Sequence, residues 1–512
     1  MLETIRGLLE GKPGDAPAVL APERETLDYA SLRDLCDRTV ERLNALGIGR
    51  GDRVAIVLPN GPEMATAFVA MASAATTAPL NPAYREEEFA FYISDLGARA
   101  LVVAEGMETP ALAVARRHGA RVLRLRVPAG APAGWFELEP EEGGGAPRAA
   151  RPGPAEAEDV ALVLHTSGTT SRPKIVPLLH RNIVASTRHI GEALALSPAD
   201  RVLNVMPLFH IHGLVAAVAS SLAAGGSIFA TPGFDAIRFF RWLDESRASW
   251  YTAVPTMHQA VLARAARNPE IVERRRLRLI RSSSASLPPQ VMRELEATFG
   301  CPVIESYGMT EAAHQMTSNP LPPRPRKPGS VGVPAGPLVR IADPSGRFLP
   351  AGEEGEVAIS GPNVTPGYES HPKANAEAFF EAEGRRWFRT GDQGRFDADG
   401  YLTITGRIKE IINRGGEKVS PLEVDNVLME HPAVRQVVTF ALPHPKLGEE
   451  VAAAVVLADG AEVNEHELRR FAAERLADFK VPRKFVFVTE IPKGATGKLQ
   501  RLGLAQRLGL VE

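Results

Sequence analysis

A run of small hydroxyl residues around one glycine is the part of the sequence best suited to hold a phosphate group. It reads His165-Thr-Ser-Gly-Thr-Thr-Ser-Arg-Pro-Lys174 and directly follows an apolar run at residues 160–164. Glycine and small side chains let backbone N–H groups approach an anion, and the lysine can neutralise its charge. The spacing differs from the Gly-Lys-Ser/Thr loop of P-loop enzymes. We therefore predict a phosphate-binding loop, with a plain Ser/Thr-rich turn as the alternative.

Two further segments carry groups suited to a nucleotide and its metal ion. In Glu305-Ser-Tyr-Gly-Met-Thr-Glu311, Tyr307 can stack on a purine, Thr310 can hydrogen-bond a phosphate, and Glu311 can bind Mg²⁺. In Arg389-Thr-Gly-Asp392, the aspartate can accept hydrogen bonds from both hydroxyls of a ribose. Each segment taken alone is also typical of a turn.

Two basic, glycine-containing segments lie later in the chain. Residues 406–421 read Gly-Arg-Ile-Lys-Glu-Ile-Ile-Asn-Arg-Gly-Gly-Glu-Lys-Val-Ser-Pro, and Pro492-Lys-Gly-Ala-Thr-Gly-Lys498 presents a lysine on a glycine loop. Either segment can be an ordinary basic turn. Lysine is scarce elsewhere, since Lys174 is the only one between Lys12 and Lys327. Because arginine and lysine are not interchangeable, its retention favours a site that needs a compact ammonium.

The elements that must position these segments follow from the apolar pattern. From about residue 53 to residue 307, short apolar runs alternate with helical patterns, which predicts parallel sheets covered by helices on both faces. The number of runs indicates two such layers. After Pro328, short strands with frequent glycine and proline predict a small β-barrel-like unit. An α+β stretch begins at Gly406 and holds seven of the eleven lysines, which indicates a separate domain.

We therefore predict an α/β protein with two domains. The large N-terminal domain, residues 1–405, contains two layered α/β sheets and the small β-barrel-like unit, in sub-units of about 1–155, 156–328 and 329–405. The small α+β C-terminal domain takes residues 406–512.

Composition and charge exclude several classes of protein. The chain has 59 basic and 61 acidic residues, a net charge of −2, which gives no electrostatic attraction to nucleic acid or to an anionic membrane. Cys36 and Cys301 are too few for a disulfide framework. The apolar stretch at 214–230 is too short and too rich in small residues to span a membrane. With no recognisable targeting segment, we expect a cytoplasmic protein without nucleic-acid or membrane partners.

Taken in this order, the five segments resemble the adenylate-forming superfamily of acyl-CoA synthetases, adenylation domains and luciferases. The resemblance covers nearly the whole chain. It implies an enzyme that uses ATP and Mg²⁺ to convert a carboxylic acid into an acyl-adenylate, with release of pyrophosphate. It also implies transfer of the acyl group to CoA after the small, mobile C-terminal domain has rotated. The partners implied are therefore a small-molecule carboxylic acid, ATP and CoA.

The resemblance assigns a role to individual residues. It implies ATP or AMP binding by Thr166, Ser167, Gly168, Thr169, Thr170, Lys174, Ser286, Glu305, Tyr307, Gly308, Asp392 and Arg407. Catalysis is implied for Thr310, Glu311 and Lys498, with Mg²⁺ on Glu311 and with Lys498 bridging the carboxylate and the α-phosphate. The hinge between the domains is expected at Lys409, and the Gly415-Gly416 loop is expected to reach the CoA thiol.

Further details resemble one branch of that superfamily, the oxalate–CoA ligases of fungi and plants. The matching segments are 170–174, 207–213, 281–287, 309–314, 318–320 and 412–418. In or beside them lie the implied acyl-pocket residues His210, His212, Ser283, Ser284 and His314. A small dianionic acid needs hydrogen-bond donors around its distal carboxylate, whereas a fatty or aryl acid needs an apolar tunnel. The plain alternative for each histidine is a structural role inside a buried motif.

Several alternatives stay open. Oxalate is the first candidate acid, followed by malonate-like, aryl and medium-chain acids. The chain can also be a stand-alone adenylation module that loads a carrier protein, a luciferase-like oxygenase or a non-catalytic homologue. Retention of Lys174, Glu311, Asp392 and Lys498 argues against the last of these. One departure from the superfamily is Ile175, which replaces the glycine that usually follows the loop lysine.

Overall fold

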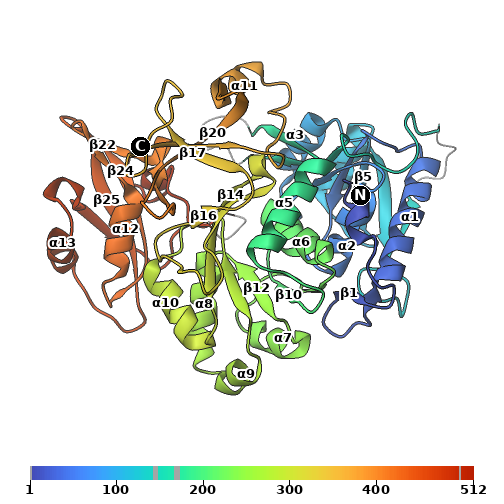
Figure 1. The fold of residues 1–512 in the computed structure, drawn as a ribbon, viewed down its shortest axis with the longest axis horizontal. Helices are drawn as coiled ribbons and strands as arrows, with labels where there is room; N and C mark the ends of the chain where they lie inside the picture. Colours follow the sequence, from blue (N-terminus) through green and yellow to red (C-terminus); the bar gives the residue numbers. More distant parts are fainter. Residues whose placement is uncertain (1–2, 142–147, 167–172, 495–497, 512) are drawn as a thin grey trace.

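The computed structural model describes residues 3–141, 148–166, 173–494 and 498–511. These residues form four β-sheets of seven, nine, five and five strands, with helices around the two larger ones. Figure 1 shows the C-terminal sheet, in orange to red, on the opposite side of the molecule from the blue and cyan N-terminal sheet. The predicted α/β class, with its small β unit and α+β C-terminal part, is confirmed.

The seven-stranded sheet has the order β7-β6-β5-β3-β4-β8-β9. Its strands are β3 (Arg53–Val57), β4 (Thr76–Pro79), β5 (Ala100–Ala104), β6 (Arg121–Arg126), β7 (Glu137–Pro140), β8 (Val160–His165) and β9 (Ile175–Leu179). Its connecting helices are α2 (Pro62–Ala72), α3 (Glu86–Leu96) and α4 (Pro110–Arg117). The central strands β5, β3 and β4 are parallel and almost fully buried because helices cover both faces. The edge strand β9 is antiparallel to β8, and the predicted phosphate loop is the segment of sequence between these two strands.

The nine-stranded sheet has the order β16-β15-β14-β13-β12-β10-β11-β1-β2. Its strands are β1 (Pro17–Leu20), β2 (Leu27–Asp28), β10 (Arg201–Asn204), β11 (Ser227–Ala230), β12 (Trp250–Ala253), β13 (Leu279–Ser282), β14 (Val303–Met309), β15 (His314–Ser318) and β16 (Val333–Pro334). Its surrounding helices are α1 (Tyr29–Ala45), α5 (His180–Ala193), the π-helix η2 (His212–Ala219), α6 (Ser220–Ala223), α7 (Phe239–Ser246), α8 (Pro255–Ala265), α9 (Pro269–Arg274) and α10 (Pro289–Phe299). The apolar stretch at 214–230 is thus a buried helical segment that runs into β11. Within the described residues, every helix is too short or too polar to cross a membrane.

The two large sheets exchange strands that are distant in sequence. β1 and β2 come from the first 28 residues but join the nine-stranded sheet, where β1 pairs with β11. Conversely, β8 joins the seven-stranded sheet through β4. A division of the chain near residue 155 therefore does not separate the two sheets, and the domain boundaries stay predictions.

The remaining two sheets are small and mostly antiparallel. One contains β17 (Leu338–Ala342), β18 (Gly355–Ser360), β19 (Phe379–Ala382), β20 (Arg385–Phe396) and β21 (Leu402–Arg407), with helix α11 (Pro372–Ala378). The other contains β22 (Ile412–Arg414), β23 (Glu417–Val419), β24 (Val434–His444), β25 (Gly448–Leu457) and β26 (Lys484–Phe487), with α12 (Pro421–Met429), α13 (Glu465–Ala473) and α14 (Leu504–Arg507). The chain passes from one to the other through the single turn η4 (Ile408–Glu410).

Gly332 ties the edge of the nine-stranded sheet to β21, since its C=O accepts a 2.7 Å hydrogen bond from the N–H of Leu402. Its φ is +86°, and an added Cβ would lie 2.0 Å from the carbonyl carbon of Ser318. We predict that Gly332→Ala lowers the free energy of unfolding by more than about 2 kcal/mol, because backbone strain and a backbone clash combine. Gly400→Ala is the matched control, with φ +80° and open space around it. Equal losses of stability in denaturant titrations of both variants would contradict this reading.

Candidate active site

The predicted site segments lie where strands of the two large sheets end. Thr166 follows β8, His210 and His212 follow β10, Ser283 and Ser284 follow β13, and Thr310 and Glu311 follow β14. Parallel strands present their carboxyl ends at one edge of a sheet, which is where ligands bind in open α/β sheets. The order of the strands therefore gathers residues from separate segments into one region.

The first group of side chains converges on the carboxylate of Asp392. Tyr307 Oη donates to Asp392 Oδ2 at 2.5 Å, and Arg407 Nε donates to Oδ1 at 2.8 Å. Asp392 on β20 lies directly opposite Arg407 on β21. Asp392 raises the pKa of Arg407, and burial together with this carboxylate raises the pKa of Tyr307. Each carboxylate oxygen keeps a further lone pair, which leaves room for ribose hydroxyls.

A second group surrounds Glu311. Its buried carboxylate accepts a 2.8 Å hydrogen bond from Tyr368 Oη. Lys174 Nζ lies 4.6 Å from the centre of the Tyr368 ring, so a cation and a carboxylate flank the same tyrosine. The hydroxyl and backbone of Thr166 bond the backbone of Lys174 and close the base of the loop. Ser167, Gly168, Thr169 and Thr170 lie outside the described residues.

Glu311 fits a magnesium ion that is shared with a substrate phosphate. Burial raises the pKa of Glu311, so a cation beside it would compensate a carboxylate that is poorly solvated. No group of three or more His, Cys, Asp or Glu side chains that could hold a metal ion by itself occurs among the described residues. Mg²⁺ commonly uses one or two carboxylates and takes its other ligands from phosphates and water, and Glu311 meets that requirement.

A third group is built from buried histidines. The nitrogens of His212 lie 3.0 Å from Ser284 Oγ and 2.6 Å from Thr252 Oγ1. The ring of His314 lies 5.1 Å from that of His212. Burial, with smaller contributions from neighbouring cations, lowers the pKa of both histidines far below the usual value, so both are neutral. Burial and the charge of Lys498 lower the pKa of His210 to about 3.

The backbone at this group is strained. Ser284 has φ +75° and His314 has φ +101°, in a region that residues with a side chain rarely adopt and that concentrates at functional sites. Gly308 permits this arrangement, because an added Cβ would lie 1.8 Å from the carbonyl oxygen of His314.

Lys498 connects the groups electrostatically. Its positive charge lowers the pKa of His210, His212 and His314. Although the residue as a whole is exposed, the protein atoms around its ammonium and the charge of Arg407 lower its own pKa, and Asp392 opposes this effect. The ammonium therefore acts both on the Asp392 group and on the histidines.

Three residues predicted to bind ATP or the acyl group are not part of the three groups described above. Ser283 Oγ donates to the carbonyl of Ser306 and is fully buried. Glu305 is also interior, where it accepts the N–H of Leu287 at 2.8 Å, and burial raises its pKa to about 8. Ser286 is exposed on the same loop. These contacts indicate that Ser283 and Glu305 hold the loop after β13 in place.

The residues predicted for the second half-reaction lie apart from these groups. Lys409 is exposed on the turn η4, between the two small sheets. Gly415 and Gly416 form the turn of the β22–β23 hairpin with φ +61° and +98°, and Gly415 N–H donates to the carbonyl of Leu447. Ile175 begins β9 with its side chain in the apolar core.

The structure adds residues that the sequence analysis did not single out. Tyr368, Thr252 and Arg281 contact Glu311, His212 and His314, respectively. Tyr368 has no sequence signal. An arginine inside the apolar run that forms β13 is a signal for Arg281, because charged side chains are rarely buried without a purpose.

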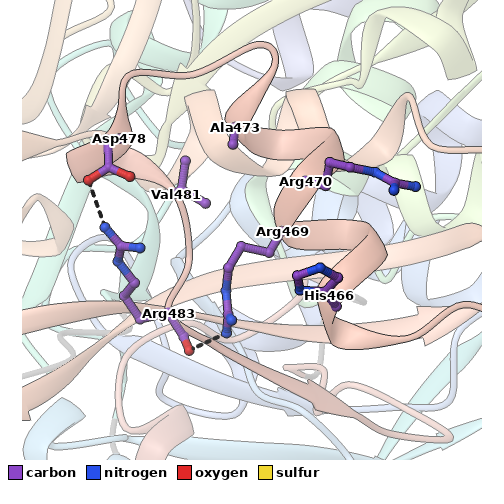
Figure 2. Close-up of a pocket in the computed structure, with 7 residues that line it drawn as sticks. All are labelled: His466, Arg469, Arg470, Ala473, Asp478, Val481 and Arg483. Carbon is purple, nitrogen blue, oxygen red and sulfur yellow. Dashed lines mark hydrogen bonds and ion pairs between the residues drawn. The ribbon is translucent and has the colours of Figure 1, made fainter.

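A cavity of about 240 Å³ lies on the C-terminal part of the chain, away from these groups. Figure 2 shows the side chains that line it, His466, Arg469, Arg470, Ala473, Asp478, Val481 and Arg483. Two of its arginines are already engaged, since Arg469 donates to the carbonyl of Arg483, and Arg483 pairs with Asp478. None of the groups described above lines this cavity.

Known proteins identify the family. Residues 9–369 match the AMP-binding enzyme family, and residues 423–498 match the AMP-binding enzyme C-terminal domain. An oxalate–CoA ligase from Arabidopsis thaliana is 44% identical over 98% of both chains. One from Saccharomyces cerevisiae is 42% identical over 96% of this chain and 94% of its own. The crystal structure of ATP-bound MatB from Rhodopseudomonas palustris has a TM-score of 0.86 at 31% identity, with 98% and 97% of the two chains covered.

The chain therefore belongs to the AMP-binding enzyme family. Its class is that of the AMP-forming acyl-CoA ligases, which are ATP-dependent acid–CoA ligases. This outcome confirms the family resemblance inferred from the five segments, including its oxalate–CoA ligase branch.

The buried carboxyl of Glu305 makes stability depend on pH. Its folded-state pKa of about 8 exceeds the usual 4.5, so the folded state binds its proton more tightly than the unfolded state does. The free energy of unfolding should therefore fall as the pH rises from about 4.5 through 8, by at most about 1.4 kcal/mol per pH unit. Glu305→Gln cannot ionise at this position, so the difference between its thermal midpoint and that of wild type should increase in favour of the variant from pH 6 to pH 8.5. A constant difference across this range would contradict the prediction.

Proposed function

We propose that this ligase activates a small dicarboxylic acid as its acyl-adenylate and transfers it to CoA, with oxalate as the leading candidate. The observation that carries the choice of acid is the polar group formed by buried His212 and His314 and half-buried Ser284. A fatty or aryl acid would leave such donors unpaired, which is costly in a buried site. The oxalate–CoA ligase activity named for the Arabidopsis and yeast relatives supports the same choice.

The first half-reaction joins two anions. One carboxylate oxygen of the acid attacks the α-phosphorus of ATP, the new P–O bond forms, and the bond to pyrophosphate breaks. The ammonium of Lys498, which acts on Asp392 and on the histidines, would stabilise the negative charge where the acid meets the α-phosphate. Tyr307, Asp392 and Arg407 would hold the adenosine. Mg²⁺ at Glu311 would offset the charge of the phosphates, together with Lys174 and the hydroxyl of Thr310.

The second half-reaction releases AMP. The thiolate of CoA attacks the acyl carbon, and the bond from that carbon to the phosphate oxygen breaks. We place the pivot for this step at Lys409, because the single turn η4 is the link between the sheet that carries Asp392 and the C-terminal sheet. Rotation there would withdraw Lys498 and bring the Gly415-Gly416 turn toward the acyl group, a conformational gate of a common kind. The cytoplasmic location stays a prediction.

Lys498→Ala tests the assignment of the first half-reaction. We expect adenylation to slow by about 10²–10³, the range for loss of one transition-state donor. Thioester formation from supplied acyl-adenylate should change far less. Lys493→Ala is the matched control, since Lys493 lies on the same hairpin and pairs with Glu490. Equal losses in both half-reactions would rule out the assigned role.

Acid choice is tested by pyrophosphate release with Mg·ATP, CoA and a panel of C2 to C10 acids. Wild type should have a higher kcat/KM for oxalate than for acetate or hexanoate. His314→Ala should lower kcat/KM for oxalate by about 10–100-fold, because the charged acid loses one buried hydrogen-bond donor. ATP binding, measured by calorimetry, should be nearly unchanged because Tyr307 and Asp392 are intact. A wild type that prefers hexanoate would refute oxalate and leave the ligase class standing.

A further inference from the structure

Arg281 is a fully buried arginine that has no acidic partner among the described residues. It lies on β13 in the interior of the nine-stranded sheet, and its side chain is 0% exposed. Its Nε has no hydrogen-bond partner there. Its terminal nitrogens lie 3.4–3.5 Å from three neutral acceptors, Thr252 Oγ1, His314 Nδ1 and Gln315 Oε1. Burial lowers the pKa of Arg281 to about 9, so it is still charged at neutral pH.

Two other arginines whose side chains are mostly buried have acidic partners. Arg501 pairs with Glu410 and Asp425, and Arg414 pairs with Glu450. An unpaired buried charge is among the most costly features of a protein interior. The anion that compensates Arg281 is therefore expected to come from outside the chain.

The nearest buried carboxyl in the sheet does not serve this purpose. Glu305 on β14 lies opposite Ser282, whereas Arg281 lies opposite Ile304. Because successive side chains of a strand point to opposite faces, Arg281 and Glu305 lie on different faces of the sheet. Glu305 instead accepts the N–H of Leu287.

The contact with Arg281 determines which ring nitrogen of His314, on β15, carries the proton. A guanidinium can only donate hydrogen bonds, so Nδ1 of His314 must accept. The ring of His314 is neutral, because burial and nearby cations lower its pKa far below the usual value. Its proton is therefore on Nε2, which becomes a donor.

A second chain of contacts leads to Ser284. Thr252 Oγ1 accepts from Arg281 and lies 2.6 Å from Nε2 of His212. If the threonine hydroxyl gives its one proton to Nε2, the neutral ring of His212 carries its own proton on Nδ1 and donates it to Ser284 Oγ at 3.0 Å. The hydroxyl hydrogen of Ser284 is then free to donate. Both chains begin at the same cation, and with this orientation of the threonine hydroxyl both end at a donor in the predicted acyl site.

We propose that Arg281 is a positioning residue that makes the acyl site selective for small acids with a second negative charge. It orients His314 Nε2 and Ser284 Oγ as donors and places a permanent positive charge behind them. This inference rests on the proposed function, because it takes these donors to face the bound acid. It assigns Arg281 a role in substrate specificity and identifies the negative charge of the second acid group as the feature that the enzyme recognises.

The test compares oxalate with oxamate, its half-amide, which has nearly the same shape and one negative charge fewer. The measured quantity is the ratio of kcat/KM for oxalate to that for oxamate, from pyrophosphate release. Wild type should favour oxalate strongly. Arg281→Met should lower this ratio by about 10–100-fold. The variant loses a positive charge and the orientation of two donors, and this loss weakens binding of the oxalate dianion more than binding of the oxamate monoanion. Arg281→Lys keeps the charge but not the forked donor geometry, so its ratio should be intermediate.

The matched control is Arg278→Met. Arg278 lies just before β13 and pairs with Asp200 at 2.8 Å, so it takes no part in the two chains of contacts. Its variant should keep the wild-type ratio even if its stability falls. Equal losses for oxalate and oxamate in Arg281→Met would show that Arg281 is only structural and would overturn the proposal.

Three further outcomes are decisive. If Arg281→Met does not fold, Arg281→Lys decides alone, and a wild-type ratio in that variant would overturn the positioning role. A wild type that activates neither acid would refute the proposed function, and the inference would fall with it. A wild type that prefers oxalate, with an unchanged ratio in Arg281→Met, would refute the inference alone.

Discussion

The carboxylate of Asp392 is the point at which the separate parts of this chain are held together around the site. Tyr307 reaches it from β14 of the nine-stranded sheet, and Arg407 reaches it from β21, the last strand before the C-terminal part. Lys498, from the far end of the sequence, acts on the same carboxylate. A single buried acid thus fixes the position of an aromatic ring and a guanidinium and attracts an ammonium. Such fixed charges are the main means by which enzymes stabilise charge that develops in a reaction.

The remainder of the site meets one electrostatic constraint, the repulsion between a carboxylate and a polyphosphate. Lys174 and Glu311 flank Tyr368 on the side proposed for the phosphates. The side proposed for the acid has neutral histidines, with the cation of Arg281 behind them. Neutral donors in front of a buried charge can bind a dianion without a competing ion pair, because the protein offers the guanidinium no carboxylate among its described residues.

Sequence patterns located the strand ends before the predicted site segments, because these ends are visible as apolar runs followed by glycine and hydroxyl residues. They did not predict the partners of the residues in those segments. Whether Glu305 or Arg281 faces the histidines depends on the register between β13 and β14, which a single sequence does not reveal. The exchange of β1 and β8 between the large sheets was missed for a related reason, since both pairings join strands far apart in the chain.

The exchange of labelled pyrophosphate into ATP, measured in the absence of CoA, tests the central claim most directly. The account predicts exchange that depends on oxalate and is far slower with hexanoate, because the acyl-adenylate forms before the thiol is needed and the acid is recognised by its second charge. Exchange that requires CoA, or that proceeds equally with both acids, would contradict it.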